Sequence, residues 1–75
     1  MTGNRMTKDA ISARTRIGMR IAATREECRM TQNELAAKTG LRQAHISRIE
    51  CGTYSVGFDT LEKIAQAMGK KVDLV

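Results

Sequence analysis

The sequence contains no proline and no tryptophan, and it has only one tyrosine and one phenylalanine among its 75 residues. With so few aromatic side chains, the core must be built from Ile, Leu, Ala, Met and Val, which suits short packed helices. A chain of this length has room for one domain, which buries only about 60% of the surface that the unfolded chain exposes. Substrate pockets usually need a larger scaffold, so the composition favours a binding module over an enzyme.

Cysteine, histidine and long apolar runs are also scarce. The two cysteines, Cys28 and Cys51, lie far apart in the sequence, and His45 is the only histidine. We therefore expect no metal site, no redox motif and no cofactor. Catalysis by His45 with Cys51 is disfavoured because no residue supplies an orienting acid or an oxyanion site. Without a signal peptide or an apolar run of about 18 residues, the expected location is the cytoplasm.

Positive charge is in excess and unevenly distributed. The chain has 13 Lys and Arg against 8 Asp and Glu, a formal net charge of +5. Residues 1–48 hold 10 basic and 4 acidic side chains, whereas residues 49–75 hold 3 and 4. A concentrated basic surplus is expected of a phosphate-binding surface. A solvated basic helix remains the alternative interpretation of the charge alone.

The N-terminal part of the chain predicts a flexible arm followed by a helix. Residues 1–10 show no apolar period and are expected to form the arm, whereas residues 11–69 are expected to form the folded domain. Apolar residues then recur at roughly helical spacing: Ile11, Ile17, Ile21, Ala22 and Cys28. Gly18 lies inside this helix and weakens it by about 1 kcal/mol relative to Ala.

Two short helices with sharp boundaries follow. Thr31 and Glu34 have the spacing of a capping box, in which each side chain accepts from the backbone amide of the other residue. The helix that they open must end at Gly40, because glycine fits the left-handed conformation just past a helix end. Another helix is predicted over about residues 43–50, and it ends at Gly52.

A fourth helix and a short strand are predicted at the C-terminal end. The helix follows from an apolar stripe: Phe58, Leu61, Ile64, Ala65 and Met68. Residues 70–75 are rich in β-branched side chains and predict a strand. A lone strand needs a second subunit or solvent as its partner. We expect this segment to pair with its symmetry mate in a homodimer, with Val72 and Leu74 packing against Met68.

Two short helices around a glycine-centred turn form the helix-turn-helix arrangement. Ala36 is small where the two helices approach each other, and four aliphatic residues are expected to fill the core beneath the crossing: Leu35, Leu41, Ile46 and Ile49. The outward positions of the second helix are then free to enter a major groove: Gln43, Ala44, Ser47 and Arg48. Gln can pair with adenine and Arg with guanine, and an alanine methyl can touch the thymine methyl.

From Ile17 to Gly69 the sequence resembles the Cro/repressor-type helix-turn-helix family, often called XRE-like. The matching segments are I-G-x-x-I-x-x-x-R, M-T-Q-x-E-L-A-x-K-T-G-L, I-S-R-I-E-x-G and D-T-L-x-K-I-A-x-A-M-G. The resemblance implies an all-α, compact, lambda-repressor-like domain of four to five helices, here with the short C-terminal β-strand added. It also implies a DNA-binding transcriptional regulator.

The resemblance assigns roles to individual residues. Gln43, Ala44 and Arg48 fall where family members contact bases, with Ser47 beside them. Gln32 falls where relatives contact a phosphate and brace the recognition helix. Arg25 and Glu50 match a pair that links the first helix to the end of the recognition helix, and a phosphate contact by Arg25 stays open. Further phosphate contacts are expected from Lys38, Arg42 and His45, and a spectator role stays open for His45.

The sequence departs from the family pattern at several positions. Arg42 stands where relatives often have Ser or Thr as N-cap, so the recognition helix is expected to be less well capped. Cys51 replaces a common polar residue near the DNA backbone, which removes one phosphate contact. Val56 and Gly57 replace a frequent Pro-Ser, which predicts a looser loop.

The predicted function is sequence-specific binding of a double-stranded DNA operator by a homodimer, on a near-palindromic site with half-sites about 34 Å apart. Such a dimer is expected to repress by blocking polymerase, and activation stays open although the sequence shows no device for it. Two alternatives stay open. One is an antitoxin that represses its own operon and binds a cognate toxin protein, and the other is a protein-interaction adaptor that uses the fold without DNA. No enzymatic activity and no membrane partner are expected, and DNA binding would place the protein at the nucleoid.

Overall fold

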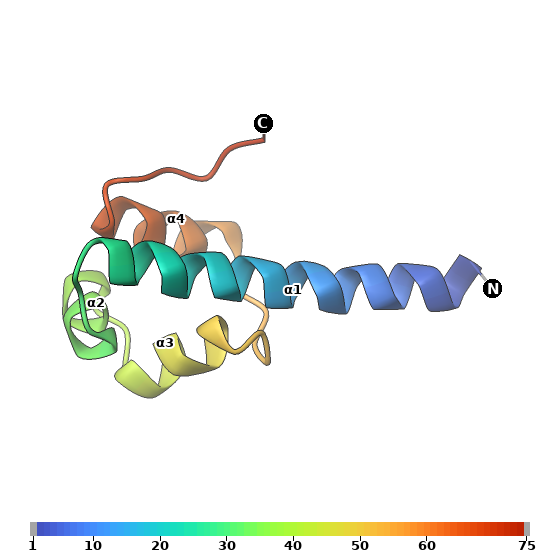
Figure 1. Ribbon diagram of the computed structural model, residues 1–75, viewed down its shortest axis with the longest axis horizontal. Helices are drawn as coiled ribbons and strands as arrows, with labels where there is room; N and C mark the ends of the chain where they lie inside the picture. The colour runs from blue at the N-terminus through green and yellow to red at the C-terminus, as the bar shows by residue number, and fades with distance from the viewer. Residues whose placement is uncertain (1, 75) are drawn as a thin grey trace.

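The computed structural model describes the backbone of residues 2–74 and the side chains of residues 13–74. It contains α1 (Thr2–Glu27), α2 (Gln32–Thr39), α3 (Gln43–Glu50) and α4 (Phe58–Ala67). The three shorter helices gather around the C-terminal half of α1, with α3 and α4 at opposite edges of the fold (Figure 1). The predicted all-α class is therefore confirmed. Of the helices in the described chain, none is both long and apolar enough to cross a membrane.

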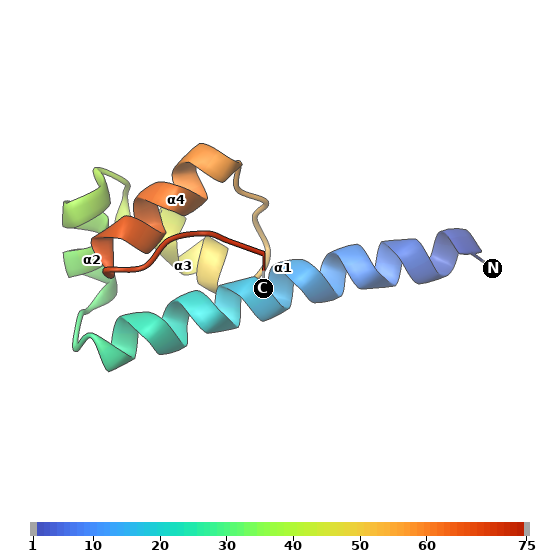
Figure 2. The ribbon, with the colours of Figure 1, turned by 90° about the horizontal axis from the view of Figure 1, so that it is seen from above.

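The first helix is longer than the sequence predicts. Residues 2–10, where we expect a flexible arm, are helical and continue α1 beyond the rest of the fold (Figure 2). No proline interrupts this stretch, and each residue added to an existing helix gains a hydrogen bond without a new nucleation step. Met1 lies outside the described residues.

The sequence signals that predict the start and the end of α2 are confirmed. The hydroxyl of Thr31 accepts from the amide of Glu34 at 3.0 Å, and the amide of Thr31 donates to Oε1 of Glu34 at 2.8 Å. Both halves of the capping box are thus present, and they satisfy two amides that a helix start leaves without partners. The helix ends at Gly40, whose φ of 75° is left-handed. At the start of α3, Arg42 makes no side-chain capping bond, in agreement with its departure from the family pattern.

The hydrophobic core lies between α1 and the three shorter helices. Its buried members come from all four helices and the residue after α4: Ile21, Leu35, Ala36, Ile46, Ile49, Ile64 and Met68. Leu35, Ile46 and Ile64 are fully buried, and burial of such a side chain contributes about 1.5–3 kcal/mol. Leu41 packs at the margin of this cluster. The aliphatic core predicted beneath the helix crossing is therefore confirmed.

Two glycines allow the backbone of α1 to touch the end of α3. A Cβ added at Gly18 would lie 2.5 Å from the carbonyl oxygen of Ile49 and 2.6 Å from that of Glu50. A Cβ at Gly52, which has a φ of 76°, would lie 2.8 Å from Cα of Thr15. The sequence alone makes Gly18 a weak point of a helix, but the structure shows that it permits a close approach between two helices.

Two predictions for the C-terminal part are wrong. Residues 70–74 contain no strand, because a strand needs a neighbouring strand and the amide of Val72 donates instead to Oε1 of Glu62 at 3.0 Å. Val75 lies outside the described residues. Phe58, expected in the apolar stripe, is 83% exposed, because it is the first residue of α4 and precedes the turns that pack on the core.

Candidate nucleic-acid interface

The outer face of α3 is polar and open to solvent. Gln43, Ala44 and Arg48 are exposed and Ser47 is half-buried, whereas Ile46 points into the core. The eight residues of α3 thus divide into a face that packs and a face that is free. Because α3 lies at one edge of the fold (Figure 1), its free face is accessible to a groove about 12 Å wide.

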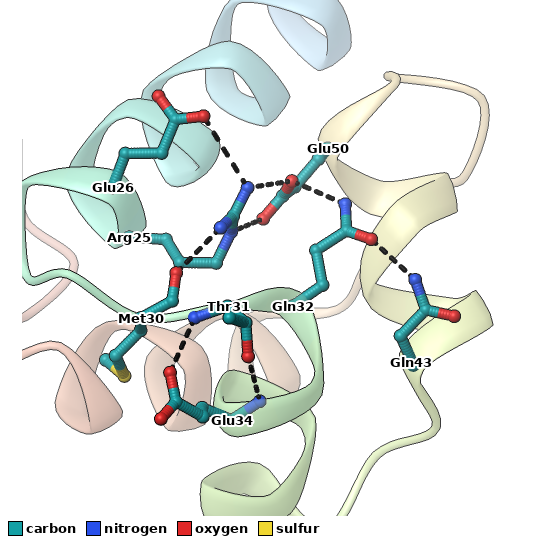
Figure 3. Close-up of polar contacts among 8 residues, drawn as sticks. All are labelled: Arg25, Glu26, Met30, Thr31, Gln32, Glu34, Gln43 and Glu50. Carbon is teal, nitrogen blue, oxygen red and sulfur yellow. Dashed lines mark hydrogen bonds and ion pairs between the residues drawn. The ribbon is translucent and has the colours of Figure 1, made fainter.

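A hydrogen-bonded network connects α1 to the first residue of α3 (Figure 3). Arg25 donates from Nε to Oε2 of Glu50 at 2.7 Å and from Nη2 to Oε1 at 3.2 Å. Gln32 donates from Nε2 to the same Oε1 at 2.9 Å. Gln43 in turn donates from Nε2 to Oε1 of Gln32. The Arg25–Glu50 pair implied by the family resemblance is thus formed, and Gln32 extends it to the recognition helix.

The ion pair at the base of this network is shielded from solvent. The side chain of Arg25 is 12% exposed and that of Glu50 is 6% exposed. Arg25 also donates from Nη1 to the carbonyl oxygen of Met30 at 2.7 Å. The hydrogen bond to Glu50 is the main cause that raises the pKa of Arg25 above its ordinary value, although burial acts in the opposite direction. The guanidinium of Arg25 therefore stays charged, and it is hydrogen-bonded to a side chain of opposite charge, as a buried charge requires.

The direction of donation sets the orientation of the Gln43 amide. One N–H of this amide is used by Gln32, so its second N–H and its oxygen remain available to an outside partner. A donor and an acceptor side by side match N7 and the N6 amino group of adenine in the major groove. The network can thus present an adenine-reading group at the start of α3.

The other residues predicted to contact phosphate lie around the outer face of α3, and they differ in burial. Lys38 and Arg42, at the end of α2 and the start of α3, are exposed. His45 is half-buried, and its Nε2 atom is buried without a hydrogen-bond partner among the described residues. The His45 ring meets the ring of Tyr54 edge-to-face, with centroids 4.6 Å apart and planes at 89°. The structure therefore brings Arg25, Gln32, Gln43 and Glu50 together and places His45 in a separate aromatic pair.

Tyr54 is a further residue beside α3 that is not among those predicted from the sequence. This residue lies in the loop after α3 and lines a hollow of about 270 Å³ beside that helix, together with Arg42, Ala44, His45 and Arg48. One signal could have found it, because Tyr54 is the only tyrosine of the chain and lies in the loop that follows the recognition helix. Among the side chains that the structure describes, no cluster of His, Cys, Asp and Glu could hold a metal ion.

Two helices joined by a turn at Gly40, the second with a free polar face, define a helix-turn-helix protein. The chain belongs to the Helix-turn-helix family, whose model matches residues 21–75. This confirms the resemblance to the Cro/repressor type, and the match includes α2, α3 and α4.

Several proteins of known name are similar to this chain. An "Uncharacterized HTH-type transcriptional regulator y4dL" of Sinorhizobium fredii is 41% identical over 58 residues, which are 77% of this chain and 30% of that protein. The "Immunity repressor protein" of Bacillus phage phi105 is 37% identical over 59 residues, 79% of this chain and 41% of that protein. "Control protein C.BamHI" of Bacillus amyloliquefaciens is 45% identical over 40 residues, 53% of this chain and 49% of that protein.

A solved structure shares the fold. The clp gene regulator ClgR of C. glutamicum superposes with a TM-score of 0.77 at 25% sequence identity, over 79% of this chain and 76% of that one. The curated relatives are longer, since the chain spans between 30% and 49% of their length. The similarity to them is therefore a similarity of the DNA-binding fold.

Proposed function

We propose that this protein binds double-stranded DNA in a sequence-specific manner and regulates transcription, as a repressor. The observation that carries the proposal is the exposed face of α3, whose first residue, Gln43, is oriented by Gln32 and the buried Arg25–Glu50 pair. The names of its relatives support the same function, since they include a transcriptional regulator and a phage repressor.

In this proposal, the outer face of α3 contacts base edges. Gln43 pairs with adenine through its free N–H and its oxygen, and Arg48 pairs with the O6 and N7 atoms of guanine. The methyl of Ala44 touches a thymine methyl, and Ser47 adds a polar contact to a neighbouring base. All but Ser47 are exposed in the free protein, so this readout needs no rearrangement of the fold.

Phosphate contacts hold the helix in the groove. Lys38 and Arg42 are exposed basic residues on either side of the turn, and such side chains give affinity without sequence preference. Gln32 already bonds to two partners, so it acts mainly as a brace with a phosphate contact at its edge. Arg25 is 12% exposed and is engaged by Glu50, which favours the linking role over a phosphate contact.

The proposed functional unit is a homodimer on a near-palindromic operator. Leu74 is 98% exposed and Val72 is 41% exposed, so the C-terminal segment offers apolar surface to a second copy. Met68, expected to pack with these two residues, is only 8% exposed and belongs to the hydrophobic core of its own subunit. Deletion of residues 71–75 should give monomers by light scattering at concentrations where the full chain is a dimer. An unchanged mass would refute this mode of dimerisation.

The proposal is tested by selecting bound duplexes from a random DNA library and then measuring affinity against salt concentration. We expect a palindromic consensus, and Arg48→Ala should lose about 1–3 kcal/mol of binding free energy at one base position of each half-site. Lys63→Ala on α4 removes the same charge from an exposed residue outside the interface, and it should leave the consensus unchanged. Steep salt dependence without a consensus would indicate a non-specific binder, and no binding would favour an adaptor.

A further inference from the structure

The hollow beside α3 has the chemistry of an anion site. Its five lining residues include two arginines, Arg42 and Arg48, one histidine and one tyrosine, but no acidic residue. The hollow lies on the flank of the recognition helix, between α3 and the loop that follows it. When a helix enters the major groove, its flanks face the phosphate backbones that border the groove. The anion expected at this place is therefore a DNA phosphate.

Tyr54 is fixed at the rim of this hollow by the loop that carries it. Thr53 donates to the carbonyl oxygen of Arg48 from both its amide and its hydroxyl, each at 3.2 Å. Gly52, in a left-handed conformation, turns the chain back toward α1 just before this point. These contacts tie the loop to the last turn of α3. Tyr54 is 45% exposed, so this residue is open to solvent at the hollow and is not part of the core.

His45 supports Tyr54 from within α3. The two rings meet edge-to-face at 4.6 Å, a geometry that aromatic pairs prefer and that restricts ring rotation. The buried Nε2 of His45 has no hydrogen-bond partner within residues 13–74. The contact that the structure gives this ring is therefore its packing on Tyr54.

We propose that the hydroxyl of Tyr54 and the guanidinium of Arg42 together bind one DNA phosphate in this hollow, with His45 as the residue that positions Tyr54. The inference rests on the proposed function, because the phosphate belongs to the bound operator. It gives His45 a different role from the direct phosphate contact that the sequence suggests.

The first test removes only the hydroxyl. Tyr54→Phe keeps the ring and its contact with His45, and it should weaken binding about tenfold for each half-site of the selected operator, the size expected for one hydrogen bond to a charged group. The loss should be the same for operator variants, because a phosphate contact carries no base preference. Ser55→Ala removes a hydroxyl from the next loop residue and should bind like the unchanged protein.

The second test locates the phosphate. Single methylphosphonate linkages, which remove the charge of one phosphate, are placed in turn along the operator. At one position in each half-site, the linkage should weaken binding of Tyr54→Phe less than it weakens binding of the unchanged protein, because only Arg42 still contacts that phosphate in the variant. The positioning role is tested by His45→Ala, which should lose as much affinity as Tyr54→Phe and add nothing to it in the double variant. His45→Phe keeps a ring against Tyr54 and should restore most of the affinity.

The possible results separate this inference from the proposed function. If the unchanged protein binds no DNA, both are wrong. If it binds and Tyr54→Phe binds equally well, or changes the consensus at one base, only the phosphate role of Tyr54 is overturned. If His45→Phe fails to restore affinity while melting temperature is unchanged, the positioning role of His45 is wrong.

Discussion

The two sides of α1 differ in how closely they pack. Toward α3, the helix makes backbone contact at Gly18 and an ion pair through Arg25. Toward α4, Ile17 remains 40% exposed, and an open hollow of about 280 Å³ lies among α1, α4 and the first residues after α4. The same helix is thus tightly fixed on one side and loosely covered on the other.

This difference in packing matches what the recognition of DNA bases by α3 would require. Hydrogen bonds to base edges need donors and acceptors within a few tenths of an ångström of their places. The side that holds α3 therefore has contacts between groups that cannot adjust: carbonyl oxygens against a glycine, and a bidentate ion pair. The side toward α4 has flexible aliphatic chains, which tolerate small shifts. The closer packing thus indicates that α1 and α3 are the two helices that must keep a fixed angle to each other.

The largest effect on stability is expected from Arg25→Met. This change leaves the buried Glu50 carboxylate without its ion-pair partner, and it should lower the free energy of unfolding by about 3 kcal/mol. Urea denaturation of the variant measures the loss. Arg16→Met, which removes an exposed arginine from the same helix, is the matched control and should change stability by less than about 0.5 kcal/mol. Equal losses in the two variants would mean that the Arg25–Glu50 ion pair stabilises the fold no more than an exposed arginine does.

A somewhat smaller effect is expected from Gly18→Ala. The added methyl would meet two carbonyl oxygens of α3 at 2.5 and 2.6 Å, so α1 and α3 must move apart, at a cost of about 1–3 kcal/mol that outweighs the better helix propensity of alanine. Thermal unfolding by circular dichroism checks this. Gly57→Ala adds the same carbon where nothing lies within 4 Å, and it should be clearly less harmful. A more stable Gly18→Ala protein would show that the close approach is not required.

The smallest effect is expected on the loose side of α1. Ile17→Ala removes a side chain that is 40% exposed and should cost about 1 kcal/mol, whereas Ile21→Ala, one turn further and 6% exposed, should cost about 2–4 kcal/mol. Chemical denaturation of the two variants gives the comparison directly. Both residues line the hollow toward α4, so similar losses would mean that Ile17 is packed as closely as Ile21.

Local rules predict much of this fold from the sequence. The capping box of Thr31 and Glu34 and the left-handed position of Gly40 depend on residues within one turn, so they place α2 correctly. The bounds of α3 follow from the same kind of signal. The link between Arg25 and Glu50, 25 residues apart, could only be inferred from the family resemblance.

Features that depend on distant neighbours could not be predicted. Gly18 is unfavourable within its own helix, and its reason becomes visible only when α3 lies against it. A strand at residues 70–74 depends on a partner that the single chain does not contain. The pairing of His45 with Tyr54 depends on the course of a loop that has no strong turn signal of its own.

Tyr54 is also the only tyrosine in a chain without tryptophan. The intrinsic tyrosine fluorescence of the protein therefore comes from one side chain, which lines the hollow beside α3. Quenching of this emission on addition of DNA would report on that hollow alone, without any attached dye. The protein thus contains its own optical probe at the surface where we expect DNA to bind.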